Sequence, residues 1–189
     1  MKSTIAIVAV LFTASATFAA NEAATALATE AQATLKAGET KPALALMEKA
    51  IEADPNDATL QTDYAQMLVT RINEVNFMVK GMVAGKMLKA YERSVEIDPN
   101  HLTGWIGLSR YYLNAPAIAG GSADKAEPYA QEVHKRLAWL GNTELALVAE
   151  KRGDLAKAAA LFQATIDERP DHGEAVAGLK RVTSAAAAK

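Results

Sequence analysis

The sequence predicts an all-α protein, a solenoid of antiparallel helix pairs closed by a C-terminal capping helix. Half of the residues are apolar and only 6% are aromatic, and alanine, the strongest helix former, predominates. Valine and isoleucine are sparse after the first dozen residues, so few residues favour β-strands. Apolar residues recur at helical spacing ahead of three proline-containing helix stops. These stops are Asp54-Pro55-Asn56, Asp98-Pro99-Asn100 and Arg169-Pro170-Asp171.

The composition excludes several kinds of function. The net charge of −2 is spread over interleaved signs, whereas nucleic-acid binding requires a concentrated basic face. Without cysteine there is no disulfide, thiolate metal site or cysteine nucleophile. His101, His134 and His172 lie far apart, so we expect no metal, and we expect His101 and His172 to be solvated in loops. No phosphate loop, nucleophile elbow or acid–base pair is present, so we predict no catalytic residue, no cofactor and no enzyme activity.

The first 20 residues have the pattern of a signal peptide. Lys2 precedes an apolar stretch over residues 5–12, which is shorter than the roughly 20 residues that cross a bilayer. Small residues follow, and they suit cleavage within residues 16–20. The alternative is an uncleaved membrane anchor. We therefore expect an exported protein, periplasmic in a bacterium or extracellular, with no membrane span after signal removal.

The first two helix pairs are predicted over residues 24–57 and 58–100 of a domain spanning 21–182. Gly38 is the expected break within the first pair and Pro55 its stop. The second pair is longer than the other pairs, and the excess lies within residues 71–86. This excess is either an elongation of the pair's first helix or a loop that contains Gly81 and Gly85.

The third pair is predicted over residues 102–138 and carries an insertion at 114–122. Pro116 stops its first helix, Gly120 and Gly121 permit unusual backbone geometry, and Ser122 caps the next helix. The insertion is either a long turn between helices or a functional element. The functional interpretation is a lip over a groove, or a helix N-terminus that offers N–H groups to an anion.

The end of the chain is predicted in the same way. Gly141 is the expected end of the third pair's second helix, and the fourth pair occupies residues 139–172. Within that pair Gly153 ends the first helix and Asp154 caps the second. Residues 173–182 form the capping helix, and residues 183–189 are expected to be a flexible tail.

The stretch Trp105-Ile106-Gly107-Leu108-Ser109-Arg110-Tyr111-Tyr112 is similar to the first-helix pattern of tetratricopeptide repeats (TPRs), with Ser109 in place of glycine. Over residues 24–182 the chain resembles the TPR superfamily, which implies a right-handed superhelix. Residues 80–126 contain Tyr112-Leu113-Asn114-Ala115-Pro116 and then Gly120-Gly121-Ser122. This segment resembles a group of exported bacterial TPR proteins, and more loosely the TPR partner subunits of tripartite periplasmic transporters, which bind solute receptors.

A TPR array offers a concave surface lined by the first helix of each pair, so we expect a scaffold or adaptor that binds a protein or peptide in this groove. The alternative is an accessory or small-ligand-binding component of a periplasmic solute-transport system, in which Lys80 or Arg110 faces a cavity. The oligomeric state is left open. Arg110 is the first candidate, because its guanidinium suits a carboxylate; its alternative role is an ion pair with a neighbouring helix. The other candidate binding residues are Asn114, Thr103, Ile106, Gln66, Lys80, Gly120, Gly121 and Ser122. The helical period also projects Leu113, Thr143, Glu144, Leu147 and Glu150 onto the groove.

Overall fold

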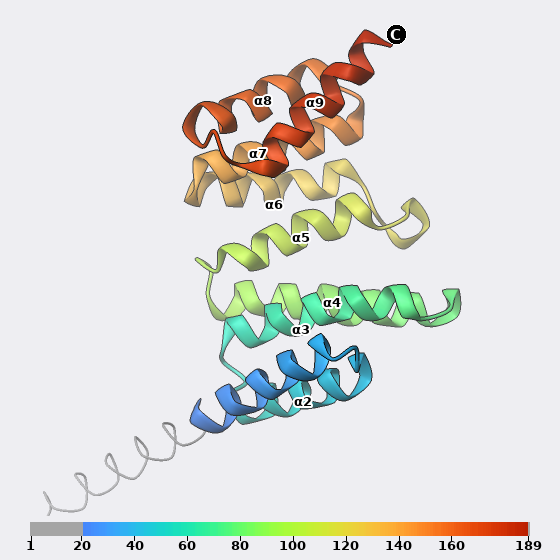
Figure 1. The fold of residues 1–189 in the computed structure, drawn as a ribbon, viewed down its shortest axis with the longest axis vertical. Helices are drawn as coiled ribbons and strands as arrows, with labels where there is room; N and C mark the ends of the chain where they lie inside the picture. The colour runs from blue at the N-terminus through green and yellow to red at the C-terminus, as the bar shows by residue number, and fades with distance from the viewer. Residues whose placement is uncertain (1–20, 189) are drawn as a thin grey trace, which may run out of the picture. The chain divides into compact units, whose positions relative to one another are not determined.

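The computed structural model describes residues 21–188, so the predicted signal peptide lies outside the described residues. All regular structure within this range is helical (Figure 1). Residues 21–36 are helical and are followed by eight α-helices and one short 3₁₀ helix. In chain order these are α2 (Thr40–Ala53), α3 (Ala58–Glu74), α4 (Phe77–Ile97), α5 (Leu102–Asn114), η1 (Ala117–Ala119), α6 (Ala123–Arg136), α7 (Ala138–Arg152), α8 (Leu155–Glu168) and α9 (Gly173–Ala187).

The chain divides into two compact units, Met1–Ile97 and Asp98–Lys189. Among the described residues, unit 1 contains the helix over 21–36 and helices α2 to α4, and unit 2 contains α5 to α9. Within each unit, helices that follow one another in the chain pack against each other. This is the arrangement of stacked helix pairs that the sequence predicts. The division between Ile97 and Asp98 lies a few residues before the predicted end of the second pair at residue 100.

The extra residues of the second pair lengthen both of its helices: α3 has 17 residues, against 13 in α5 and 15 in α7, and α4 has 21. The predicted elongation of the first helix is therefore present in part, and the predicted loop with two glycines was wrong. Helix α3 ends at Glu74, and α4 begins at Phe77 and continues through Gly81 and Gly85 to Ile97. The Asn76 side chain starts α4 by accepting the N–H of Val79 at 3.2 Å. A glycine inside a helix costs only about 1 kcal/mol, so neither glycine breaks this long helix.

The insertion in the third pair is a closed turn between α5 and α6. Pro116 starts the 3₁₀ helix η1, and Gly120 adopts a left-handed conformation with φ of 83°. The N–H of Gly121 donates to the Pro116 carbonyl at 3.1 Å, and the N–H of Ser122 donates to the Tyr112 carbonyl at 2.9 Å. A Cβ on Gly121 would lie 1.8 Å from a backbone oxygen of the turn, so only glycine fits there. These contacts favour the turn interpretation.

Gly141 does not end a helix, contrary to our prediction. It lies inside α7, whose first residue is Ala138, and α6 has already ended at Arg136. A Cβ on Gly141 would lie 2.1 Å from the Cα of His134. The glycine is therefore explained by the close crossing of α6 and α7, which a sequence does not distinguish from a helix stop.

The boundaries of the last helices are set by residues next to them in the sequence. Gly153 ends α7 in a left-handed conformation with φ of 81°, and Asp154 caps α8 by accepting the N–H of Lys157 at 3.1 Å. Both agree with the predicted roles. In contrast, His172 is not simply solvated, because its Nδ1 accepts the N–H of Ala175 at 3.3 Å and caps α9. Helix α9 continues past the predicted tail boundary to Ala187, since the residues there are mostly alanine.

The core of unit 2 is built from small residues around a few large ones. Phe162 of α8 is fully buried, and a Cβ on Gly178 of α9 would lie 2.4 Å from its ring. The indole N–H of Trp105 donates to the Pro99 carbonyl at 2.9 Å. Arg136 donates to the same oxygen at 2.9 Å and lies over the Trp105 ring at 4.9 Å. These contacts fasten the Asp98-Pro99-Asn100 turn to unit 2.

Candidate functional site

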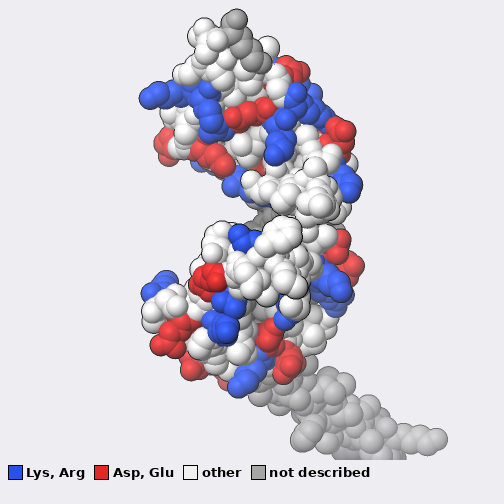
Figure 2. All heavy atoms as spheres, turned by 90° about the vertical axis from the view of Figure 1, so that its right-hand side faces the viewer, with Lys and Arg blue, Asp and Glu red and all other residues white. Residues whose placement is uncertain are grey.

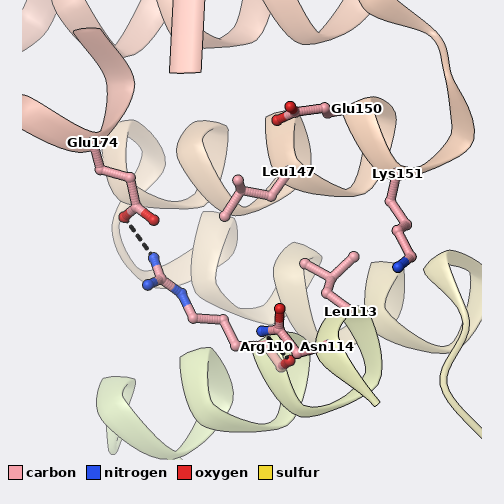
Figure 3. Close-up of a pocket in the computed structure, with 7 residues that line it drawn as sticks. All are labelled: Arg110, Leu113, Asn114, Leu147, Glu150, Lys151 and Glu174. Carbon is pink, nitrogen blue, oxygen red and sulfur yellow. Dashed lines mark hydrogen bonds and ion pairs between the residues drawn. The ribbon is translucent and has the colours of Figure 1, made fainter. Parts of the chain in front are cut away.

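The candidate site is an open hollow of about 470 Å³ on unit 2 (Figure 3). It lies between α5, α7 and α9, which are the first helices of the two pairs and the capping helix. This is the surface on which the sequence predicts partner binding. Its lining residues are Arg110, Leu113, Asn114, Leu147, Glu150, Lys151 and Glu174.

Arg110 connects all three helices of the hollow. Its Nε and Nη2 atoms donate to Glu144 Oε1 of α7 at 2.9 and 2.7 Å. The same Nη2 donates to Glu174 Oε2 of α9 at 2.7 Å (Figure 3). The intramolecular ion pair, which was our alternative role for Arg110, is therefore present. Binding of an external carboxylate by Arg110 stays a prediction.

The two carboxylates that hold Arg110 lie in different surroundings. The Glu144 side chain is 0% exposed, whereas that of Glu174 is 42% exposed. Burial raises the pKa of the Glu144 carboxyl, and the Arg110 guanidinium opposes this rise. Burial would lower the pKa of Arg110, but its hydrogen bonds to both carboxylates outweigh this and raise it. Glu144 is therefore a fixed internal partner, and Glu174 is a partner that solvent reaches.

The rest of the hollow combines apolar and charged groups. Leu113 of α5 and Leu147 of α7 lie between the guanidinium of Arg110 and the amine of Lys151 (Figure 3). Glu150 is paired with Arg181, whose Nη2 donates to Glu150 Oε2 at 2.6 Å. Lys151 has no hydrogen bond or ion pair to any residue within 21–188. The hollow therefore has two leucines between Arg110, which is already paired with two carboxylates, and Lys151, which has no partner within the described residues.

The structure brings together only some of the predicted groove residues of unit 2. Arg110 and Asn114 line the hollow, and Asn114 donates to the Arg110 carbonyl at 2.8 Å. Thr103 is exposed and Ile106 half-buried on α5, but neither is among the hollow's lining residues. Thr143 and Glu144 are fully buried, so their projection onto the groove surface was wrong. In both cases the side chain has an internal polar partner that the helical period does not reveal.

Two lining residues were not among the predicted ones. Lys151 follows Leu147 by one helical turn on α7, so the same period could have found it. Glu174 lies in the first turn of α9. Finding it would have required the position of the capping helix over the groove, for which the sequence carries no local signal.

The predicted residues of unit 1 lie on separate surfaces. Gln66 is exposed on α3 and lines a hollow of about 330 Å³ next to the helix over 21–36. In that hollow the Gln32 side chain donates to Asp63 Oδ2 at 3.0 Å. Lys80 is exposed on α4. Lys80 and Arg110 thus belong to different units.

Gly120, Gly121 and Ser122 form the turn described above. The Ser122 hydroxyl accepts the N–H of Asp124 at 3.1 Å, so it caps α6 as predicted. The Asp124 carboxylate, in the first turn of α6, pairs with Arg152 at 2.6 Å. A carboxylate of the chain itself therefore stands at this helix N-terminus, where an external anion was one of the predicted possibilities.

Within residues 21–188 no three histidine or acidic side chains are arranged to hold a metal ion. The same part of the chain contains no helix with the length and apolar character needed to cross a bilayer.

Comparison with known proteins identifies the fold. No family model and no curated protein sequence matches the chain, but many solved structures do. TTC0263, a thermophilic TPR protein of Thermus thermophilus, superposes with a TM-score of 0.71 at 17% identity and covers 85% of this chain and 81% of its own. PilF of Pseudomonas aeruginosa gives a TM-score of 0.66 at 16% identity over 87% and 69% of the two chains. MamA of Desulfovibrio magneticus gives 0.60 at 15% identity over 88% and 96%.

These identities are too low to transfer a function, but the superpositions extend over most of each chain. They agree with the stacked helix pairs of the described residues. The chain has the TPR fold.

Proposed function

We propose that this protein is an exported, non-catalytic scaffold that binds a protein partner as an extended segment in the hollow of unit 2. The observation that supports this most directly is the composition of the hollow. Leu113 and Leu147 provide an apolar centre, and cations from α5 and α7 stand at its ends. An extended segment with an apolar side chain next to a carboxylate matches this pattern.

The ion pairs of Arg110 suggest how such a carboxylate binds. Glu144 is buried and holds the guanidinium in place, whereas Glu174 is 42% exposed. A carboxylate of the partner takes the position of Glu174 on Arg110 Nη2, and Glu174 turns into solvent. Because one carboxylate replaces another, the net electrostatic gain is small, and the partner's apolar contacts supply most of the affinity.

The test is binding of labelled extended peptides that carry leucine and aspartate at varied spacing, measured by fluorescence anisotropy. The matched control peptides have asparagine in place of aspartate. Glu174→Gln frees the outer side of Arg110, so we expect it to strengthen binding of the aspartate peptides several-fold. Lys151→Gln removes the other cation and weakens binding.

The control peptides distinguish this mechanism from nonspecific apolar binding, because their affinity should not change with Glu174→Gln. The mechanism would be refuted if Glu174→Gln weakened binding of the aspartate peptides, since Glu174 would then contact the partner rather than compete with it. The scaffold function itself is refuted if no peptide of the set binds wild type and none binds Glu174→Gln.

A further inference from the structure

The outer face of α4 in unit 1 carries large apolar side chains that nothing in the described structure covers. Phe77 is 81% exposed, Met78 is 88% exposed and Met82 is 63% exposed. They account for three of the six large apolar residues that are exposed within 21–188. The turn between α3 and α4 lies at the right-hand edge of Figure 1 and faces the viewer in Figure 2, where the surface of unit 1 shows a continuous uncharged area. We call Phe77, Met78, Gly81, Met82 and Gly85 the α4 face.

No contact within the described residues requires glycine at two positions of this face. Gly81 and Gly85 both lie within α4, and an added Cβ would meet no atom within 4 Å at either position. Gly121, Gly141 and Gly178 are different, because a Cβ there would collide with the chain. Each glycine weakens the helix relative to alanine. At helical spacing Phe77, Gly81 and Gly85 form one stripe.

A stripe of this kind suits a second helix. Without side chains at Gly81 and Gly85, a partner helix can approach the α4 backbone closely, while Phe77, Met78 and Met82 stand beside it and contact its apolar residues. A hollow of about 280 Å³ continues this surface between α2, α3 and α4. Its apolar lining includes Leu44 and Leu68, and Met82 stands at its edge. A recess of this volume accepts an anchoring side chain, which a flat lipid surface does not supply.

The charges around the α4 face indicate which charged side chains the partner helix carries. The sequence from Val75 to Tyr91 contains Lys80, Lys86 and Lys89 and no acidic residue. Lys86 is paired with Glu48 at 3.1 Å. Lys80 and Lys89, like Lys41 at the hollow, make no ion pair within the part of the chain that the structure describes. Unpaired lysines around an apolar face are complementary to carboxylates.

We propose that the α4 face is a second docking surface, separate from the hollow of unit 2, and that its occupant is an acidic amphipathic helix of a partner protein. The apolar side of that helix packs on Phe77, Met78 and Met82 across the glycine stripe. Its glutamate and aspartate side chains lie near Lys80, Lys89 and Lys41. The surface can be occupied whether or not a peptide is bound at Arg110.

The experiment uses the mature full chain and two synthetic amphipathic helical peptides with the same leucine face. One carries glutamate on its polar side and the other carries lysine, and binding is measured by anisotropy at low and physiological salt. We expect the acidic peptide to bind, with affinity falling as salt rises, and the basic peptide not to bind. Met78→Ser/Met82→Ser should weaken binding at least tenfold, and Lys80→Glu/Lys89→Glu should abolish it.

Gly81→Ala/Gly85→Ala provides the decisive variant, because the added methyl groups meet nothing inside the chain and alanine strengthens the helix. We expect a higher thermal midpoint together with binding that is several-fold weaker. Unchanged binding in this variant would overturn the inference that a partner helix packs closely against Gly81 and Gly85. Glu174→Gln is the matched control at the other site, and it should leave binding of the acidic helical peptide unchanged.

Three results overturn the proposal. The first is that the acidic helical peptide does not bind wild type. The second is that light scattering gives a dimer at micromolar concentration that Met78→Ser/Met82→Ser converts to a monomer, because the occupant is then a second copy. The third is that vesicles of anionic lipid displace the acidic peptide from wild type, because the occupant is then a lipid surface. None of these results bears on the extended peptides that test the hollow of unit 2.

Discussion

Replacing Arg110 with methionine should destabilise unit 2 strongly at neutral pH and only weakly at pH 5. The substitution keeps an apolar stem of similar length but leaves the Glu144 carboxyl, which is 0% exposed, without its cation. Removing one partner of a buried ion pair typically costs about 3–5 kcal/mol. The exposed pair of Arg110 with Glu174 adds only about 0–1 kcal/mol to this.

The loss is limited because the carboxyl can bind a proton instead of remaining charged. With an ordinary glutamate pKa of about 4.3, keeping the group protonated at pH 7 costs at most about 3.7 kcal/mol, and at pH 5 at most about 1 kcal/mol. Burial already raises the pKa of Glu144 in wild type, and loss of the guanidinium raises it further. Because the pKa of this carboxyl is raised in the folded state, its contribution to the free energy of unfolding is fully present below the unfolded-state pKa. That contribution is lost as the pH rises through the folded-state pKa.

The measurement is urea unfolding at pH 5 and pH 7, followed by tryptophan fluorescence. Both tryptophans, Trp105 and Trp139, belong to unit 2, so the signal reports this unit alone. We expect a loss of about 2–4 kcal/mol at pH 7 that falls to about 1 kcal/mol at pH 5. Equal losses at the two pH values would refute the reasoning, because the damage would then come from packing rather than from an unpaired charge.

Two control variants belong to this experiment. Glu174→Gln removes only the exposed partner of Arg110 and should cost less than about 1 kcal/mol at either pH. Arg110→Met/Glu144→Leu removes both members of the buried pair, so it should recover most of the stability lost in Arg110→Met.

Three further predictions concern packing and ionisation. Gly178→Ala places a methyl group against the Phe162 ring, 2.4 Å away before relaxation, and should lower the unfolding free energy of unit 2 by about 1–3 kcal/mol in the same tryptophan assay. Gly141→Ala meets the His134 backbone as well as its Cβ, and backbone cannot move aside as a ring can, so it should cost more than Gly178→Ala; the reverse order would contradict the close crossing of α6 and α7. Burial and a hydrogen bond to Glu48 raise the pKa of Tyr64 to about 12, so unit 1 should lose up to about 2.7 kcal/mol as the pH rises from 10 to 12. Circular dichroism should show this loss in wild type and not in Tyr64→Phe.

The fold was predictable where a residue acts on its own stretch of backbone. Pro170, Gly153 and Asp154 end or begin helices through φ restriction, a left-handed conformation and a capping hydrogen bond, and the structure shows α7 and α8 ending and starting where these residues stand. Such effects need no knowledge of the rest of the chain.

The same reasoning failed where a residue acts through another helix. Gly141 permits a close helix crossing, and Gly81 lies within a continuous helix, yet each has the sequence appearance of a break. His172 was assigned to solvent because its capping bond to Ala175 depends on the rotamer of one side chain. Glycine and histidine each have several structural uses, and tertiary contacts select among them.

The candidate site shows the same division. The helical period placed Arg110, Asn114 and Leu147 on one surface, and all three line the hollow. It did not separate an exposed acid from a buried one, so Glu144 was expected in the groove, while Glu174 was missed because it enters from the capping helix. Burial depends on what lies above a helix, and the period of one helix does not contain that information.

The hydrogen bonds to the Pro99 carbonyl have a consequence for where the chain can be cut. Trp105 and Arg136 both donate to this oxygen, so the residues that follow the unit boundary are held by unit 2 rather than forming a free linker. A protease that separates the two units should therefore cleave before Pro99 and not between Pro99 and Leu102. A fragment that starts at Asp98 keeps both hydrogen bonds, and with them the N-terminal closure of its first helix.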